Sequence, residues 1–431
     1  MATGKRLAII GCGPKALAIA AKTKVLREIG IADIEVVIFE KSSVASHWTG
    51  KCGYTDGQQT LGTLPEKDIG FPYKSEFGSQ VDHGMIQYSW HSYLISKTDY
   101  GPWIDRGRPH PHHAEWAAYL KWVAEKTGVE IRYHEVVGIT PLEHGFRLAV
   151  ENSDEKLKSW EADVFSGVVF TGPGEPLKIH DHPTHKWNED IVNGRNFWQR
   201  VAVFSALDDA EVAIVGSGET AASIVVALLR EAPDLKIYII NRHGTLYTRG
   251  ESYHENRYFT DPKDWEDLAL VDREDFMRRT DRGVFSVASK QEIDHAKNLT
   301  VITGNVKRIE NAGDKVDVHV QRLHGKGYQT FVYKYDKIIV AIGFDALTPL
   351  ELFPDHLRSK NKLKDIRSKI DYHLRIPLLD TDTLEDAPPM NIHLPMLAGL
   401  SQGPGFPNLS CLGTLSDRIL GAYIETSNRA T

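Results

Sequence analysis

One glycine pattern occurs twice in this chain of 431 residues, at positions far apart in the sequence. The first copy, Gly11-Cys12-Gly13-Pro14-Lys15-Ala16, follows the apolar run 7–10; the second, Gly216-Ser217-Gly218-Glu219-Thr220-Ala221, follows the apolar run 212–215. The first glycine of each copy permits a tight strand-to-helix turn, the second lets a pyrophosphate approach the backbone, and the small last residue lets helix and strand pack closely. Two copies therefore predict an α/β fold with two Rossmann-like dinucleotide-binding domains.

The charge that follows the second strand of each unit indicates which dinucleotide binds there. Glu40 ends the apolar stretch 34–39, where a carboxylate binds a ribose 2′-hydroxyl and repels a 2′-phosphate. Arg242 ends the stretch 235–241, where a cation suits the 2′-phosphate of NADPH. We therefore expect FAD at the first site, NADPH at the second, and electron transfer between them. The alternative for both residues is a solvated charge at the end of a strand.

Composition limits the class of protein. Hydrophobic residues make up 41% of the chain and charged residues 25%, which predicts a soluble globular protein, and the net charge of −7 argues against nucleic acid as a partner. Cys12, Cys52 and Cys411 form no Cys-x-x-Cys pair, which disfavours a flavin disulfide reductase. The first expected strand leaves no room for a signal peptide, and no apolar run is long enough to span a membrane. We expect a cytoplasmic protein.

The pattern of elements predicts one domain inserted into another. Residues 43–113 are expected to be irregular and functional, and the following stretch 113–127 to be a helix. The sequence His110-Pro111-His112-His113 is interpreted as a loop before that helix and not as a metal site. Apolar strands within 167–174 and 338–344 are both expected to return to the first dinucleotide. This predicts an FAD-binding domain with the substrate pocket over 1–200 and 336–431, and an NADPH-binding domain over 201–335.

Further segments around the two glycine patterns carry a resemblance to a known family. They are Ser46–Trp48, Tyr88–Leu94, Glu115–Ala124, Glu251–Phe259 and Pro407–Leu412. In this order they resemble the Trp-containing turn, Tyr-Ser-Phe-x-x-Tyr-Leu, Glu-Phe-x-x-Tyr-Leu-Arg-Trp, Asp-Ser-Pro-Phe-x-Asn-Glu-Ile-Phe and Pro-Asn-Leu-Ser-Leu-Leu of the flavin-dependent N-hydroxylating monooxygenases of siderophore pathways. The resemblance to these ornithine and lysine N-hydroxylases runs over most of the chain.

The resemblance implies an NADPH- and O₂-dependent oxidoreductase that converts a small primary amine to a hydroxylamine through a C4a-hydroperoxyflavin, in siderophore or related natural-product biosynthesis. Because the cofactor carries this chemistry, no catalytic side chain is expected. The alternatives are a flavin monooxygenase that oxygenates carbon or sulfur, whose Phe-x-Gly-x-x-x-His signature is missing, and a non-enzymatic dinucleotide-binding or redox-sensing protein. We further expect a homo-oligomer.

The glycine patterns, the strand-end charges and the resemblance together assign candidate site residues. The expected cofactor-binding residues are Gly11, Gly13, Pro14, Glu40, Trp48, Gln59, Gly216, Gly218, Glu219, Thr220 and Arg242. The expected substrate-binding residues are Gln58, Lys67, Asn256 and Ser410. No metal site is expected.

Two positions depart from the family's pattern. The family's lysine for the substrate carboxylate follows its glutamine by five residues, whereas Lys67 lies further along from Gln59. The family's Asn-Tyr-Ser-Val matches Val284-Phe285-Ser286-Val287, which has no asparagine. Because an unpaired buried carboxylate is costly, these changes favour a decarboxylated amine, such as a diamine or histamine, as the substrate. Ornithine and lysine stay open as alternatives, as does a role for Lys67 as an unrelated surface residue.

Overall fold

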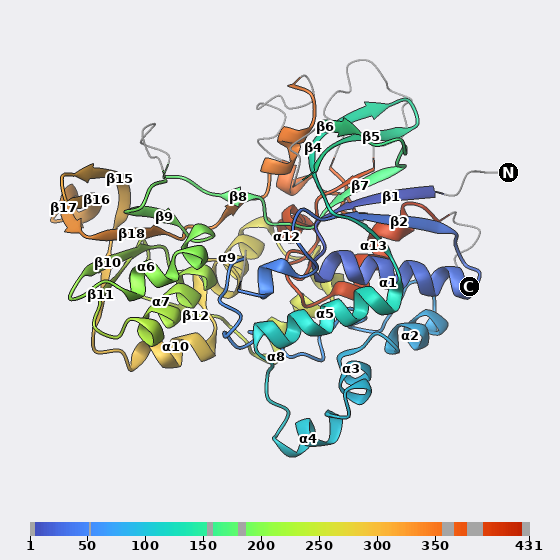
Figure 1. Ribbon diagram of the computed structural model, residues 1–431, viewed down its shortest axis with the longest axis horizontal. Coiled ribbons are helices and arrows are strands. Elements are labelled where there is room, and N and C mark those ends of the chain that lie inside the picture. The colour runs from blue at the N-terminus through green and yellow to red at the C-terminus, as the bar shows by residue number, and fades with distance from the viewer. Residues whose placement is uncertain are drawn as a thin grey trace.

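The structure is a computed structural model that describes residues 5–50, 53–152, 158–179, 187–355, 366–376 and 391–424. Two lobes lie side by side, each built on a parallel sheet, which confirms the predicted α/β class (Figure 1). Among the described residues the first sheet has, in order, β20 (Ile392–His393), β7 (Gly167–Phe170), β1 (Lys5–Ile10), β2 (Ile34–Phe39) and β3 (Glu130–Arg132). The second has β14 (Leu299–Thr303), β11 (Lys236–Asn241), β10 (Glu211–Val215), β18 (Lys337–Val340) and β9 (Ile191–Asn193).

Both glycine patterns join a strand to a helix as predicted. The first turn connects β1 to α1 (Pro14–Glu28), and the second connects β10 to α7 (Glu219–Glu231). Gly11 has φ +96° and Gly216 has φ +129°, a backbone region that other residues rarely adopt. A Cβ at Gly216 would also collide with the Ala341 carbonyl oxygen. The backbone conformation of these two turns therefore requires glycine at Gly11 and Gly216.

One strand assignment is wrong. The apolar segment 338–344 was expected to return to the first dinucleotide, but β18 lies in the second sheet, where it pairs in parallel with β10. The segment 167–174 does return to the first unit, since β7 pairs with β1. Apolar character indicates a buried strand without saying which sheet it joins, because the partner strand decides that. Strands β9 and β18 lie just outside the span 201–335, and the exact domain division stays a prediction.

The second lobe is inserted through a pair of short strands. The chain leaves the first lobe along β8 (Glu175–Pro176) and returns along β19 (Phe344–Asp345), and these two strands pair in antiparallel fashion. Arg195 forms an ion pair with Glu175 at this crossing. The strands of the first sheet therefore come from both sides of the insertion, as the sequence predicted.

The stretch 43–113 is more regular than expected. Its described part contains α2 (Ser79–Ile86), α3 (Trp90–Ser96) and α4 (Tyr100–Asp105) as well as a 3₁₀ turn at Ser46–Trp48. Ser89 caps α3 by accepting a hydrogen bond from the Ser92 N–H. Each helix is short, so buried side chains such as Trp90 and Trp103, and not helical periodicity, hold them in place. The helix predicted at 113–127 is α5 (His113–Thr127) and is confirmed.

Antiparallel sheets that were not predicted extend each lobe. Strands β4 (His134–Leu142), β5 (Gly145–Asn152) and β6 (Lys158–Trp160) flank the first lobe, and β15 (Asn305–Ala312), β16 (Lys315–His324) and β17 (Gly327–Tyr335) flank the second. One apolar core fills the first lobe, and cores on the two faces of the second sheet fill the other. Helix α1 packs against α5 and α13 (Leu412–Gly421) below the first sheet (Figure 1).

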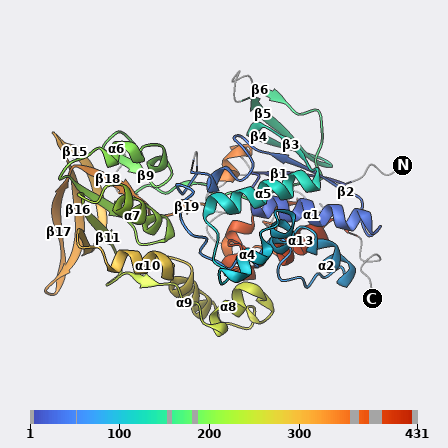
Figure 2. The same ribbon diagram turned by 60° about the horizontal axis from the view of Figure 1, so that its bottom comes forward.

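A helical segment of the second lobe reaches back to the first. Helices α8 (Tyr253–Thr260) and α9 (Leu270–Thr280) extend away from the second sheet (Figure 2). Between them, the Trp265 indole N–H donates a hydrogen bond to the Leu400 carbonyl of α12 (Gly399–Gln402), in the first lobe. The segment 247–285 therefore lies where the two lobes meet.

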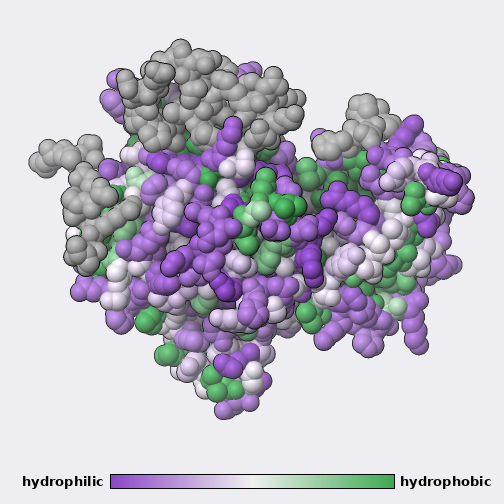
Figure 3. All heavy atoms as spheres, turned by 180° about the vertical axis from the view of Figure 1, so that it is seen from behind, coloured by the Kyte–Doolittle hydropathy of each residue, from purple (hydrophilic) through white to green (hydrophobic). Residues whose placement is uncertain are grey.

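The surface seen from behind is mostly hydrophilic, with hydrophobic side chains in small groups (Figure 3). Among the described residues, no helix is both apolar enough and long enough to cross a membrane.

Candidate cofactor and substrate site

The first glycine loop is fixed to the end of β2 by Glu40. The buried Glu40 carboxylate accepts hydrogen bonds from the Cys12 N–H at 2.8 Å and from the Ser42 N–H at 2.8 Å. Each oxygen keeps a further acceptor position, so a ribose hydroxyl can still be bound. A Cβ built at Gly13 meets no protein atom within 4 Å, so the loop has open space where a pyrophosphate would lie. These residues fit a dinucleotide such as FAD.

The second glycine loop has the same open space. A Cβ at Gly218 would come no closer than 3.9 Å to its nearest neighbour, the Gly283 nitrogen. Glu219 accepts a hydrogen bond from the Ser286 N–H at 2.8 Å, so this carboxylate holds the segment after β13 (Val284–Phe285) against the loop. Thr220 packs beside Gly194.

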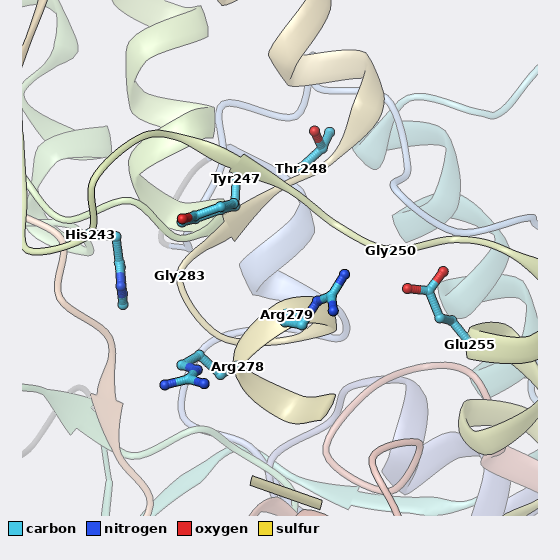
Figure 4. A pocket seen from close by; sticks show the side chains of 8 residues that line it. All are labelled: His243, Tyr247, Thr248, Gly250, Glu255, Arg278, Arg279 and Gly283. Atoms are coloured by element: carbon cyan, nitrogen blue, oxygen red, sulfur yellow. The ribbon is translucent and has the colours of Figure 1, made fainter. Parts of the chain in front are cut away.

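A cavity of about 440 Å³ borders this second loop. It is lined by His243, Tyr247, Thr248, Gly250, Glu255, Arg278, Arg279 and Gly283 (Figure 4). A Cβ at Gly283 would lie 3.3 Å from His243 Nε2 and 3.7 Å from Ser217 Oγ, which places the cavity beside the glycine loop. Burial lowers the pKa of His243, and the nearby guanidinium groups of Arg242 and Arg278 lower it further. Arg242 is exposed, so this group of cations is open to a phosphate.

The segment around Trp48 connects the first lobe to α7. Trp48 lies edge-on to His113, with ring centroids 4.8 Å apart. Gln59 is buried, and its Nε2 donates a hydrogen bond to the Ser223 carbonyl of α7 at 3.3 Å. Nearby, Asp56 pairs with Arg230 of the same helix. The side chain of Gln58 is exposed, so of the two glutamines Gln59 lies at the junction of the lobes.

Lys67 lies near the segments that contain Ser410 and Asn256 in spite of its shifted spacing. Its partly buried ammonium interacts electrostatically with Cys411, Glu251 and Arg249, and it makes no ion pair or hydrogen bond to a described residue. Burial lowers the pKa of Lys67, and Arg249 lowers it further, whereas Cys411 and Glu251 raise it. The reading of Lys67 as an unrelated surface residue therefore does not fit its surroundings.

Ser410 and Asn256 complete this group. Ser410 is buried next to Cys411, at the start of α13. The Asn256 amide nitrogen donates a hydrogen bond to the Glu251 carbonyl at 2.8 Å, which leaves the amide oxygen to accept one from a ligand. The structure thus brings Lys67, Ser410 and the segment 249–256 together from three distant parts of the sequence.

Sequence reasoning missed several charged residues here. Lys15 is buried and donates a hydrogen bond to the Pro407 carbonyl at 2.8 Å; burial lowers its pKa to about 8. Asp281 accepts a hydrogen bond from Asn408 at 3.0 Å and pairs with Arg282. Arg249 acts on the charge of Lys67 and belongs to the same group. Lys15 lies inside the first glycine pattern, and this position is a sequence signal that could have identified it.

The histidines before α5 bind backbone carbonyls. His110 Nδ1 lies 2.8 Å from the Leu61 oxygen and His112 Nδ1 lies 2.6 Å from the Gln58 oxygen, in the predicted loop. Within the part of the chain that the structure describes, no group of three His, Cys, Asp or Glu side chains is arranged to hold a metal ion. Cys12 and Cys411 are free and buried, and Cys52 lies outside the described residues.

Two glycine loops on parallel sheets, an acid after one and cations after the other, define a flavoprotein of the two-dinucleotide class. Residues 84–346 match the family L-lysine 6-monooxygenase/L-ornithine 5-monooxygenase. The chain is 39% identical to the L-lysine N6-monooxygenase MbtG of Mycobacterium sp. (strain MCS), over 99% of this chain and 96% of that protein. The structure of the lysine monooxygenase NbtG from Nocardia farcinica is similar, with a TM-score of 0.81 and 35% identity over 96% of this chain and 99% of that one.

The chain therefore belongs to the lysine and ornithine N-monooxygenase family, which confirms the resemblance in its sequence. It is an NADPH-dependent flavin N-hydroxylating monooxygenase, and FAD and NADPH are its cofactors. The ornithine N-hydroxylase KtzI of Kutzneria sp. 744 shares the fold at 18% identity, with a TM-score of 0.76 over 97% of this chain and 99% of that one. Membership of this family removes the alternatives of carbon or sulfur oxygenation and of a non-enzymatic role.

Proposed function

We propose that this enzyme hydroxylates N6 of L-lysine for siderophore biosynthesis. The observation that carries the proposal is the ammonium of Lys67, which has no described ion-pair partner and lies beside the segments that contain Ser410 and Asn256. An unpaired, partly buried cation favours a substrate with a carboxylate. The similarity to lysine N6-monooxygenases over nearly the whole chain supports lysine in particular.

This proposal replaces the expected preference for a decarboxylated amine. That expectation depended on the shifted spacing of Lys67 and on the asparagine missing at Val284, and the surroundings of Lys67 support a carboxylate site in spite of the shifted spacing. A site that holds a carboxylate at one end selects the amine by chain length, since only one length brings the amine to the reacting atoms. Ornithine, shorter by one methylene, is then a poor substrate.

In this reaction the residues of the chain bind and orient the cofactors. When bound, FAD takes electrons from NADPH and activates O₂. The open space at Gly13 and Gly218 suits the two pyrophosphates, and Glu40 suits the ribose of FAD. Arg242, His243 and Arg278 suit the 2′-phosphate of NADPH. We place Trp48 and Gln59 near the flavin, where the two lobes meet.

The test is the rate of hydroxylamine formation with NADPH, compared across L-lysine, L-ornithine, cadaverine, putrescine and histamine. We expect the highest kcat/KM for L-lysine. Cadaverine differs from lysine by the carboxylate alone, so it should lose about ten- to a hundred-fold, the value of a charge-assisted contact. A kcat/KM for cadaverine equal to that for lysine would contradict the proposal.

The proposal also includes the cellular location and the oligomeric state of the protein. We infer a cytoplasmic location, which the unpaired buried thiols of Cys12 and Cys411 support. We also infer a homo-oligomer, which light scattering after gel filtration would test directly. A mass equal to one chain at micromolar concentration would contradict it.

A further inference from the structure

The position at which the family has an asparagine is apolar in this chain. Val284, in β13, is 2% exposed, so this segment offers no side-chain donor to a substrate. An α-carboxylate held by Lys67 alone would keep unpaired oxygen acceptors in a partly buried site, which is unfavourable. A carboxylate in this site therefore requires a second donor near Val284.

Strand pairing places Arg249 beside Phe285, the residue that follows that position. Strand β12 (Tyr247–Thr248) runs parallel to β13, with Tyr247 opposite Val284. Arg249 continues this ladder, and its backbone N–H donates a hydrogen bond to the Phe285 carbonyl at 2.8 Å. The loop that leads to Lys67 passes close by, since a Cβ at Gly62 would lie 3.9 Å from Ser286 Cβ.

The side chain of Arg249 has no ion-pair or hydrogen-bond partner among the described residues. Its Nε is buried without a hydrogen bond, and no ion pair joins its guanidinium to a residue that the structure describes. Arg249 and Lys67 are near enough for each charge to act on the other. Glu251, the carboxylate that acts on Lys67, is exposed and stays outside ion-pair distance. The charges of Lys67 and Arg249 repel one another. A carboxylate ligand bound between them would offset this unfavourable electrostatic energy.

We propose that Arg249 binds the α-carboxylate of the amino-acid substrate together with Lys67, in place of the asparagine that is missing at Val284. A guanidinium offers two parallel N–H donors to a carboxylate, so it supplies more than the lost amide did. The proposal rests on the proposed function, because it requires an amino-acid substrate.

The experiment compares Arg249→Met and Arg249→Lys with the wild-type enzyme, each loaded with FAD. Arg257→Met is the matched control, since Arg257 is exposed and pairs with Asp264 on α8 and the following turn. The measurements are kcat/KM for L-lysine and for cadaverine, the KM for NADPH, and the Kd of L-lysine by calorimetry. For Arg249→Met we expect kcat/KM and affinity for lysine to fall about ten- to a hundred-fold, with cadaverine and NADPH unchanged. Arg249→Lys should recover part of the loss.

Three results would overturn this assignment. The first is an unchanged lysine-to-cadaverine ratio in Arg249→Met when the wild-type enzyme prefers lysine. The second is a raised KM for NADPH with lysine binding intact, which would assign Arg249 to the 2′-phosphate. The third is an equal effect of Arg257→Met. A wild-type enzyme that prefers cadaverine would contradict the proposed function itself. Should Arg249→Met fail to retain FAD, Arg249→Gln takes its place in the same comparison.

Discussion

At the scale of single residues, the two glycines of each loop have different roles. Gly11 and Gly216 have positive φ and neighbours at the Cβ position, so the fold itself requires them. Gly13 and Gly218 have ordinary backbone angles and empty space around a Cβ, so the protein alone would accept alanine there. The second glycine of each loop therefore matters to the ligand and not to folding.

This difference predicts the behaviour of a pair of variants. Gly13→Ala should fold with a normal Tm but lose bound FAD, because the methyl group occupies the space for the pyrophosphate. Gly218→Ala should keep its FAD and show a raised KM for NADPH. The flavin absorbance per chain, the Tm of the apoprotein and NADPH kinetics measure all three effects. A full complement of FAD in Gly13→Ala would exclude the first loop as the flavin site.

At the scale of elements, a buried ion pair joins α1 to α13. Lys22 and Asp417 pair at 2% and 1% side-chain exposure. Lys22 also donates a hydrogen bond to the Gly413 carbonyl at 2.7 Å, and Asp417 accepts one from Ser75 at 2.9 Å. Because both charges are buried and depend on such partners, the pair holds one relative position of the two helices that cover the first sheet.

Removing one partner should therefore cost more than removing both. We expect Asp417→Leu to lower the free energy of unfolding by about 3–5 kcal/mol, since it strands a buried ammonium. The double variant Lys22→Met/Asp417→Leu should recover most of that loss. Asp33→Ala, which breaks an exposed pair with Arg27, is the control and should change stability by less than about 1 kcal/mol. Calorimetric Tm values rank the four proteins, and a double variant no better than Asp417→Leu would contradict this view.

At the scale of the whole molecule, buried histidines make stability depend on pH. Burial lowers the pKa of His47 and of His113 to about 4 and that of His393 to about 3. Below pH 6.5 these histidines bind protons in the unfolded chain but stay neutral in the folded chain. They therefore reduce the free energy of unfolding as pH falls from 6.5 towards 4. Asp68 acts in the opposite sense, because burial raises its pKa to about 6.

His113 provides a direct test, since its Nδ1 is buried without a partner. His113→Phe keeps a ring against Trp48 but cannot be protonated. Between pH 7 and 5 the wild-type enzyme should lose about 1–2 kcal/mol of stability more than this variant. The measurement is the Tm of each protein at both pH values. Equal losses in the two proteins would show that the pKa of His113 is the same in the folded and the unfolded chain, which would contradict this prediction.

Local sequence patterns determined the parts of this protein that neighbours along the chain decide. The two strand–turn–helix units, the helix α5 and the class of enzyme follow from glycine spacing, apolar periodicity and short motifs, because turns and helices are set by residues a few positions apart. Tertiary structure alone decided the rest. It assigned β18 to the second sheet, buried Lys22 against Asp417, brought Lys67 near Cys411 and set Arg249 beside Phe285. Each of these depends on residues distant in sequence, whose contacts arise only when the chain packs.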